Sequence, residues 1–347
     1  MNFSKNSNES SYEIIHYVSA CLKIYSFSRI IIIENGLKSK IKVKMPLTIF
    51  DILSFNLRIL RRFFRTDKCN VFIISQSPLK LVIIRSGVVY AFENGKLKET
   101  LRLLNCRNIL HVDLCRTPSG KLLFGEYGAN IKRKLVPIYS STNEGKSWDI
   151  IYKFSPGTIK HIHCVKYDPY SNKIWTFTGD KNGECKILIS DENFQSIKIL
   201  GDGTQLWRAC NAFFLKEKVV WMMDSPNDIS YVVHFNRYTE EVKQVYRLNG
   251  PLWYSSELAN GYFIAATSVE PGYSIRNPYA TILISKNLTD WTEVKKFKKD
   301  KWPIEIFKNG VIAFPIGIQN LNEVYAFGEA LENFDGKVIK FNFSNEI

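Results

Sequence analysis

The segment His161-Ile162-His163 holds two of the five histidines in this 347-residue chain. In an extended strand, alternate side chains point to the same face and lie about 7 Å apart. Two imidazoles placed in this way can share a divalent metal with a carboxylate, or one of them can act as a general acid or base near neutral pH. The alternative is a pair of polar residues at a strand start that bond to their neighbours. His161 and His163 are therefore the candidate metal or acid–base residues.

Acidic residues follow apolar, strand-like segments at four places, at intervals of about 45 to 55 residues, which is the length range of propeller repeats. They are Glu126, Asp180, Asp224 and Glu270. If these segments are equivalent strands of successive repeats, the four carboxyl groups meet around one axis. Two of them, roughly 5–10 Å apart, would suffice for cleavage of a glycosidic bond. The alternative for each residue is the capping of a turn.

Aromatic and basic residues precede the same repeats and give candidate binding groups. Arg208 can hold a sugar carboxylate through two hydrogen bonds while Trp207 stacks on the sugar ring. The alternative is a salt bridge between repeats, from Arg208 to Asp180 or Asp224, with Trp207 in the core. A further sugar-binding platform, or else core packing, is expected of Trp253, Tyr254 and Trp302.

The elements that would position these residues repeat along the chain. Two apolar runs separated by a polar turn start at positions 138, 187, 232 and 282, and each is preceded by another pair of strand-like runs. A repeat of this length that consists only of strands is typical of a β-propeller. Weaker units occupy residues 70–104 and 302–343. We therefore expect an all-β propeller of about six four-stranded blades, or seven if strand-like runs in the first 45 residues form another.

The N-terminal residues 1–66 are expected to form an extension of strands and helix before a propeller over 67–347. Residues 47–65 predict a basic amphipathic helix. Its apolar positions are Ile49, Ile52, Leu53, Ile59, Leu60, Phe63 and Phe64, and its polar positions are Ser54, Arg58, Arg61, Arg62 and Arg65. Such a helix can lie on an anionic membrane, or it can pack its apolar side against the propeller.

The formal net charge is +14, and residues 1–66 carry eleven of the Lys and Arg side chains against four Asp and Glu. An acidic polysaccharide or an anionic membrane surface suits this balance, although a compositional bias of the source would produce it as well. Nucleic acid is not expected as a partner, because no recognised motif occurs and the later basic residues alternate with acidic ones.

The seven cysteines are scattered, odd in number and without a Cys-x-x-Cys pair, so neither a disulfide framework nor a zinc knuckle is expected. The first 15 residues lack the charged and apolar regions of a signal peptide. A cytoplasmic location is therefore expected, which includes the inner face of the membrane.

One turn carries a resemblance to a known family. Residues 141–148, Ser-Thr-Asn-Glu-Gly-Lys-Ser-Trp, resemble the Asp-box, or BNR repeat, of sialidase-like β-propellers, Ser/Thr-x-Asp-x-Gly-x-x-Trp, with Asn143 in the place of Asp. Degenerate copies occur at 190–197 and 285–291. The resemblance implies a propeller over about residues 70–345. In this superfamily the box is a folding device, whose polar residues close a turn and whose aromatic ring packs between strands.

The chain departs from true sialidases, since it lacks an Arg-Ile-Pro segment and only Arg208 stands where a carboxylate clamp is expected. The His-x-His segment is similar to one in metal-dependent propeller lyases of acidic sugars. The resemblance thus favours a glycoside hydrolase or polysaccharide lyase that acts on an acidic glycan, of uronate or sialate type, in a central funnel. Hydrolysis would use two carboxylates, whereas β-elimination would use His161 or His163 with Arg208. The alternative is a non-catalytic propeller that binds a glycan or protein and assists cell-surface polysaccharide biosynthesis.

Overall fold

The computed structural model describes residues 12–36, 39–54, 57–111, 113–273 and 277–344. The chain divides into two compact units. The first unit comprises Met1–Lys68, Tyr254–Pro271 and Asn277–Ile347, and the second comprises Cys69–Trp253 and Gly272–Arg276. Each unit is built from small sheets whose strands pair antiparallel, apart from one short parallel strand in the first unit.

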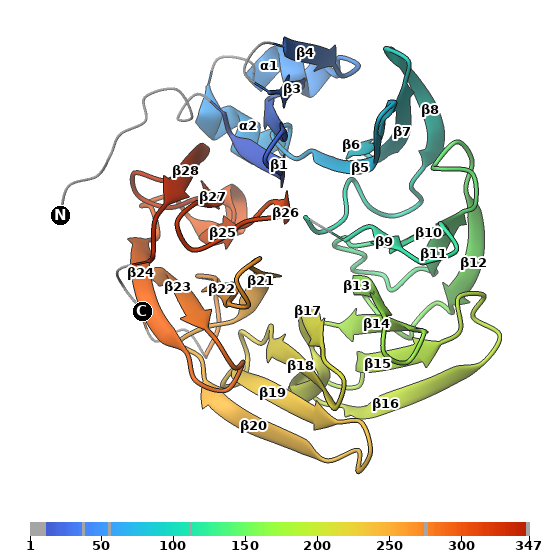
Figure 1. Cartoon of the computed structure of the whole chain (residues 1–347), viewed down its shortest axis with the longest axis vertical. Helices are drawn as coiled ribbons and strands as arrows, with labels where there is room; N and C mark the ends of the chain where they lie inside the picture. The colour runs from blue at the N-terminus through green and yellow to red at the C-terminus, as the bar shows by residue number, and fades with distance from the viewer. Residues whose placement is uncertain (1–11, 37–38, 55–56, 112, 274–276, 345–347) are drawn as a thin grey trace. The chain divides into compact units, whose positions relative to one another are not determined.

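The second unit contains four sheets, and the strands of each follow one another in chain order. Figure 1 shows these sheets side by side from cyan to yellow, with the first strand of each on the same inner side. Their strands are β5 (Asn70–Gln76), β6 (Leu79–Arg85), β7 (Val88–Glu93), β8 (Lys96–Arg102); β9 (Cys115–Arg116), β10 (Leu122–Gly125), β11 (Val136–Ser141), β12 (Asp149–Phe154); β13 (His161–Asp168), β14 (Lys173–Gly179), β15 (Cys185–Ser190), β16 (Ile197–Gly203); and β17 (Ala209–Phe214), β18 (Lys218–Met223), β19 (Tyr231–Asn236), β20 (Val242–Arg247).

The first unit contains three more sheets. Their strands are β1 (Ile14–Val18), β2 (Leu22–Phe27), β3 (Ile30–Asn35), β4 (Ser39–Lys44) with β26 (Ile316–Gly317); β21 (Leu252–Glu257), β22 (Phe263–Thr267), β23 (Tyr279–Ser285), β24 (Thr292–Lys298); and β25 (Val311–Ala313), β27 (Val324–Glu329), β28 (Lys337–Phe341). The short β26 pairs in parallel with β1, so that Val18 lies opposite Gly317. A β-carbon on Gly317 would lie 2.0 Å from the carbonyl oxygen of Val18, so only glycine fits there.

The fold is thus an all-β propeller with seven blades. The sequence predicted about six and left seven open. The additional blade is the sheet β1–β4, which the sequence analysis placed in an N-terminal extension. Short turns join β1 to β2 and β2 to β3, and the sequence of this sheet contains none of the longer Ser-to-Trp segments that revealed the repeat.

The repeated segments of the sequence are equivalent strands of successive blades. The runs near positions 138, 187, 232 and 282 become the third strands β11, β15, β19 and β23. In the turn after β11, the Ser141 hydroxyl oxygen accepts the N–H of Gly145 at 2.9 Å. The Trp148 indole N–H donates to the Thr100 hydroxyl of β8 at 3.2 Å. This turn therefore closes its own hairpin and also fastens it to the preceding blade.

Large apolar side chains fill the space between the last two blades of the second unit. Trp175 of β14 and Trp221 of β18 are both buried there, with Phe177 and Phe235. Each contributes roughly 2–3 kcal/mol through removal of its surface from water. This packing fixes β13 and β17, the two strands that carry the candidate site.

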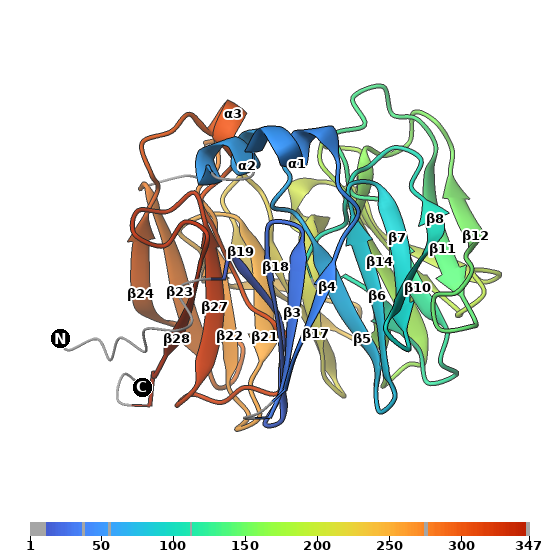
Figure 2. The ribbon, with the colours of Figure 1, turned by 90° about the horizontal axis from the view of Figure 1, so that it is seen from above.

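The helices do not form the single amphipathic helix that the sequence predicted over 47–65. There are two short ones, α1 (Ile49–Ser54) and α2 (Arg58–Phe64), and positions 55–56 of the predicted helix lie outside the described residues. Figure 2 shows both, together with α3 (Ile304–Phe307), at one end of the strands of the first unit. The expected polarity is wrong as well, because Arg61 and Arg62 are buried while Ile49 and Ile52 are exposed.

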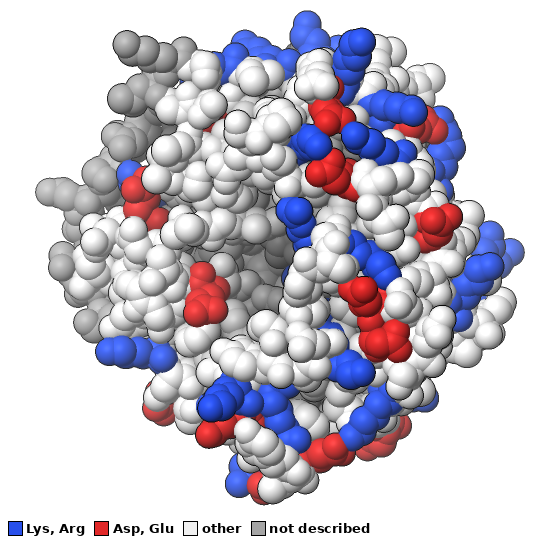
Figure 3. Space-filling model, turned by 45° about the vertical axis from the view of Figure 1, so that its right-hand side comes forward, with Lys and Arg blue, Asp and Glu red and all other residues white. Residues whose placement is uncertain are grey.

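No helix in the described part of the chain is long and apolar enough to cross a bilayer. All seven cysteines are free thiols. The surface charge is mixed on the face shown in Figure 3. Lys and Arg side chains alternate there with Asp and Glu, so the basic residues do not form one continuous patch on this face.

Candidate functional site

A β-bulge brings the two histidines of β13 together. Ile162 pairs with Thr178 and Cys164 with Phe177, so His163 is the additional residue that the ladder with β14 skips. A bulge changes the direction of the side chain that it contains and is common next to functional sites. The Nε2 atoms of His161 and His163 lie 2.9 Å apart. The bulge thus shortens the separation expected for a regular strand.

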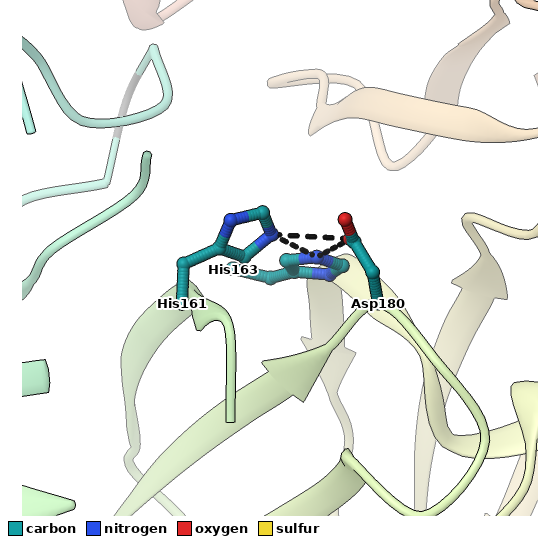
Figure 4. A group of neighbouring side chains, drawn as sticks. All are labelled: His161, His163 and Asp180. Carbon is teal, nitrogen blue, oxygen red and sulfur yellow. Dashed lines mark hydrogen bonds and ion pairs between the residues drawn. The ribbon is translucent and has the colours of Figure 1, made fainter. Parts of the chain in front are cut away.

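Asp180, which directly follows β14, completes a three-residue cluster. Its Oδ1 atom lies 3.1 Å from Nε2 of His161 and 3.2 Å from Nε2 of His163. Figure 4 shows the two rings and the carboxylate converging on one point. We call these three residues the His–Asp cluster.

The contacts of His161 assign the proton of its ring. Nδ1 of His161 lies 2.7 Å from the carbonyl oxygen of Gly128, which can only accept, so this nitrogen carries the proton of the neutral ring. Nε2 of His161 then presents a lone pair to the carboxylate of Asp180. Nδ1 of His163 is buried without a hydrogen-bond partner. Nε2 of His163 lies 2.9 Å from Nε2 of His161 and 3.2 Å from Oδ1 of Asp180, so it can donate to either acceptor when it carries the proton of its ring.

The ionisation states agree with this assignment. Burial lowers the pKa of His161 despite the opposing influence of Asp180, so the neutral ring is favoured. Burial alone would raise the pKa of Asp180, but its contacts with both imidazoles and with Arg208 outweigh this and hold the pKa well below its usual value. The cluster therefore combines a neutral His161 with an ionised carboxylate.

Arg208 connects the His–Asp cluster to a second carboxylate. It follows the short 3-10 helix η2 (Gln205–Trp207) and precedes β17. Its Nη2 lies 3.1 Å from Oδ1 of Asp180 and 3.3 Å from Oδ2 of Asp224. Trp207 stacks on Trp221, with ring centres 5.6 Å apart. Arg208 thus forms the salt bridge between blades, and Trp207 packs on a core aromatic ring. These are the roles that the sequence analysis gave as the alternative to sugar binding.

Asp224 directly follows β18 and is fully buried. Its Oδ1 accepts the indole N–H of Trp253 at 2.7 Å, so this nitrogen of the predicted sugar platform is engaged within the protein. Its Oδ2 accepts from the thiol of Cys210 at 3.3 Å and lies 3.8 Å from Nδ1 of His163. Burial raises the pKa of Cys210 well above its usual value, which keeps the thiol protonated. His163, Cys210 and Asp224 form a second group of metal-ligand type.

Glu126 has a different environment within the second unit. It accepts the backbone N–H groups of Leu104 and Asn105 and the hydroxyl of Tyr139. Burial raises its pKa. The carboxylate of Glu126 therefore holds the segment after β8 in place.

The remaining predicted site residues belong to the first unit. Glu270 follows β22 and accepts the hydroxyl of Ser268 at 2.6 Å. Tyr254 is buried, and Trp302 is partly exposed beside Phe307. The structure therefore unites six predicted residues, His161, His163, Asp180, Arg208, Asp224 and Trp253.

Sequence reasoning missed three neighbours of the His–Asp cluster. The ammonium group of Lys160 forms an ion pair with Asp180, and the ring of Tyr127 lies 4.2 Å from that of His161. Cys210 is the third. Lys160 directly precedes the His-x-His segment, and Cys210 lies two residues after Arg208, so both are next to predicted site residues in the sequence. Their residue types alone did not distinguish them from the other lysines and cysteines of the chain.

The charges around the site balance. Asp180 and Asp224 contribute two negative charges, and Lys160 and Arg208 two positive ones. A divalent cation bound at the His–Asp cluster would therefore leave a local excess of positive charge. An anionic ligand that binds beside the cation would compensate this excess.

A pocket of about 450 Å³ lies in the second unit. It is lined by Leu104, Asn105, Cys106, Arg107, Ala129, Asn130, Ile131, Lys132 and Lys134. We call it the basic pocket, because its lining includes three basic residues and no acidic one. The side-chain amide of Asn130 donates to the carbonyl oxygen of Lys160 at 2.9 Å. Gly128, which precedes the lining residue Ala129, bonds His161, so residues 128–130 contact both the His–Asp cluster and the adjacent Lys160.

No protein-family model matches the chain. No curated protein matches its sequence.

Several solved structures share its fold. A prolyl endopeptidase aligns over 96% of this chain and 50% of its own length, with a TM-score of 0.55 and 9% identity. An oligogalacturonate lyase in complex with manganese aligns over 83% and 76%, with a TM-score of 0.52 and 6% identity. A GH74 xyloglucanase from Xanthomonas campestris aligns over 82% and 45%, with a TM-score of 0.53 and 11% identity. The chain thus spans about half the length of two of these proteins. At such low identity these likenesses show the fold alone, and that fold is the β-propeller.

Proposed function

We propose that this chain is a metal-dependent propeller enzyme that cleaves an acidic glycan by β-elimination. The observation that carries the proposal is the His–Asp cluster, in which Nε2 of neutral His161, Nε2 of His163 and Oδ1 of Asp180 converge. A bound divalent cation would take these three atoms as ligands. The N–H of His161 directed at the carbonyl of Gly128 is the usual second contact of a metal-binding histidine.

The spacing of the three ligand atoms also supports a metal. Their separations are 2.9, 3.1 and 3.2 Å. Ligands at right angles on an ion with bonds of about 2.1 Å lie about 3.0 Å apart. Two imidazoles and one carboxylate on one side of the ion would leave its other positions for water or substrate.

The charge balance and the basic pocket support an acidic ligand. A uronate carboxylate would compensate the charge of the cation, and the side chains of Arg107, Lys132 and Lys134 provide favourable surroundings for further acidic sugars. An oligogalacturonate lyase with manganese is also among the structures that share the fold. A uronate polymer is therefore the substrate class that we propose.

β-Elimination requires a base for the proton next to the uronate carboxylate. When bound, a divalent ion would supply Lewis acidity to that carboxylate. We assign Lys160 as the base, because its side-chain nitrogen lies beside the His–Asp cluster, in contact with Asp180, and its side chain is about one-quarter exposed. Lys160 takes the proton, the bond to the leaving sugar oxygen breaks, that oxygen is protonated by water, and a double bond conjugated to the carboxylate remains.

The test combines manganese binding with elimination. The purified protein is titrated with Mn²⁺ under electron paramagnetic resonance, with and without oligogalacturonate, and ultraviolet absorbance of the unsaturated product is followed. We expect tighter Mn²⁺ binding with the oligosaccharide, a loss of at least about tenfold in affinity in His163→Ala and Asp180→Asn, and no elimination in either variant. Lys160→Met should retain Mn²⁺ and lose elimination. His234→Ala, which removes a histidine from β19, is the matched control.

Unchanged Mn²⁺ binding in His163→Ala would refute the metal site. New reducing ends without ultraviolet absorbance would show that the protein hydrolyses the glycosidic bond and does not cleave it by elimination. The second candidate function is glycan binding without catalysis, and one observation favours it, namely that the guanidinium of Arg208 is already bonded to Asp180 and Asp224. Binding of uronate oligosaccharides without product across a panel of acidic glycans would establish this second function.

A further inference from the structure

The helices α1 and α2 are oriented with their apolar side toward solvent. Ile49, Ile52 and Leu53 of α1 are 68%, 63% and 55% exposed. Leu57 and Phe63, at the two ends of α2, are about half exposed as well. A surface helix of a globular protein normally buries these residue types, so their exposure on two adjacent helices requires an explanation.

Buried ion pairs hold the helices in this orientation. Arg61 donates to Glu13, and both side chains are almost fully buried. Arg62 pairs with Asp300 and also donates to the carbonyl oxygen of Phe307. Rotation of α2 to bury its apolar side would break these pairs and leave charges unpaired in the interior, which is strongly unfavourable. The exposed apolar side is therefore a fixed feature of the fold.

Aromatic contacts link the exposed apolar surface of α1 and α2 to that of α3 within the first unit. Aromatic contacts run from Phe50 to Phe64, from Phe64 to Phe63, from Phe63 to Phe307 and from Phe307 to Trp302, with ring centres 5.0–6.0 Å apart. We call this surface the apolar cap. It comprises Leu47, Ile49, Phe50, Ile52, Leu53, Leu57, Phe63, Trp302 and Ile306.

The apolar cap is large. It accounts for nine of the nineteen large hydrophobic residues that are exposed in the described part of the chain. Roughly half-exposed side chains of this size present on the order of 900 Å² together, whereas the largest apolar patch on a typical monomer measures about 300–600 Å². A surface of this kind normally contacts another apolar phase.

Basic residues beside the apolar cap indicate what that phase is. Lys42 and Lys44 are exposed on β4, which leads into α1. The ammonium of Lys301 lies 5.9 Å from the ring centre of Trp302. Tryptophan with neighbouring lysines is typical of side chains at a membrane interface, where the ring lies among the headgroups and the lysines reach anionic phosphates. Of the acidic residues on α1 and α3, Asp51 is buried and bonds Thr48, and Glu305 is exposed.

We propose that the apolar cap docks this protein on an anionic lipid bilayer. Figure 2 shows α1, α2 and α3 projecting at one end of the first unit, so their side chains can enter the headgroup region without a change of fold. The apolar side chains bind the interface, and Lys42, Lys44 and Lys301 select anionic lipid. The arginines of α2 hold the helices and do not contact lipid. This proposal does not depend on the proposed catalytic function.

The test is sedimentation of the full chain with vesicles of phosphatidylcholine alone or with phosphatidylglycerol added. We expect binding to the anionic vesicles that weakens with salt. Ile49→Ser/Ile52→Ser/Leu53→Ser should reduce the partition coefficient at least about 100-fold, because three large apolar side chains leave the interface. Lys42→Gln/Lys44→Gln should reduce it about tenfold on anionic vesicles only. Ile150→Ser/Ile199→Ser/Tyr238→Ser, which removes three exposed large hydrophobic residues of the second unit, should bind like the unaltered chain.

Equal vesicle binding by the Ile49/Ile52/Leu53 variant, or no vesicle binding by the unaltered chain, would overturn the proposal. Sedimentation velocity without lipid gives the competing outcome. Self-association that the same triple variant abolishes would make the apolar cap an interface between copies of this chain instead.

Discussion

Asp113 offers a quantitative test of the interior around the candidate site. Its carboxylate accepts the backbone N–H of Val165 in β13, the strand that carries both histidines, at 2.9 Å. The residue is 2% exposed, and its Oδ2 atom has no hydrogen-bond partner. Burial raises the pKa of Asp113 to about 8, although Lys166 and the bond from Val165 oppose this shift. The carboxyl group is therefore protonated in the folded protein at neutral pH.

The sign of the effect on stability follows from proton binding. In the unfolded chain an Asp has a pKa of about 3.9, so between about pH 4 and pH 8 the folded state binds one proton more. The contribution of Asp113 is therefore fully present below about pH 4 and is lost as the pH rises through about 8. Four pKa units correspond to about 5 kcal/mol, with a slope of about 1.4 kcal/mol per pH unit.

Asp113→Asn removes this titration and keeps a carbonyl oxygen for the Val165 N–H. We expect the variant to match the unaltered chain near pH 4 and to exceed its free energy of unfolding by a few kcal/mol at pH 8. Urea unfolding followed by the fluorescence of the buried Trp175 and Trp221 measures the difference at each pH. Asp149→Asn, at an exposed position of β12, is the control. A difference between Asp113→Asn and the unaltered chain that does not change with pH would refute the reasoning.

Two further substitutions test contacts of the second unit. Arg237→Ala should lower the free energy of unfolding by about 3–5 kcal/mol at neutral pH, as measured by urea unfolding. The reason is that the fully buried Asp168 loses two hydrogen bonds of 2.5 and 2.9 Å from this arginine. A decrease no larger than that caused by Arg102→Ala, at an exposed position, would contradict this. Gly145→Ala should lower the free energy of unfolding by roughly 1–3 kcal/mol, because φ of this residue is +83° and the new β-carbon would lie 2.4 Å from Val82. In the double variant with Val82→Ala, the combined decrease should be smaller than the sum of the two single decreases. Additive decreases would show that the clash is absent.

The sequence predicted the blades that repeat a long turn. Periodicity placed β11, β15, β19 and β23 correctly, because the Ser-to-Trp segments mark a position that every such blade has in common. The same periodicity placed Asp180 and Asp224 directly after second strands. Both then lie beside Arg208, since the second strands of adjacent blades end at the same side.

Two features could not be predicted from local patterns. The bulge at His163 depends on how β13 pairs with β14, and the separation expected for a regular strand was too long as a result. The orientation of α2 depends on partners remote in sequence, Asp300 and Asp335, which bond Arg62. Helical periodicity shows which residues share a side of a helix, but it does not show which side faces inward when the interior supplies carboxylates.

The parallel pairing of β1 with β26 has a consequence for the biosynthesis of the protein. Residues 44 and 316 are far apart on the chain, so at synthesis rates of about 5–20 residues per second the partner of β1 is made roughly 15–55 s after β4. During that interval one edge of β1 lacks its neighbour, and Arg62 lacks both Asp300 and Asp335. The sheet β1–β4 is thus completed only after β26 has been made, and until then the free edge of β1 can pair with other strands.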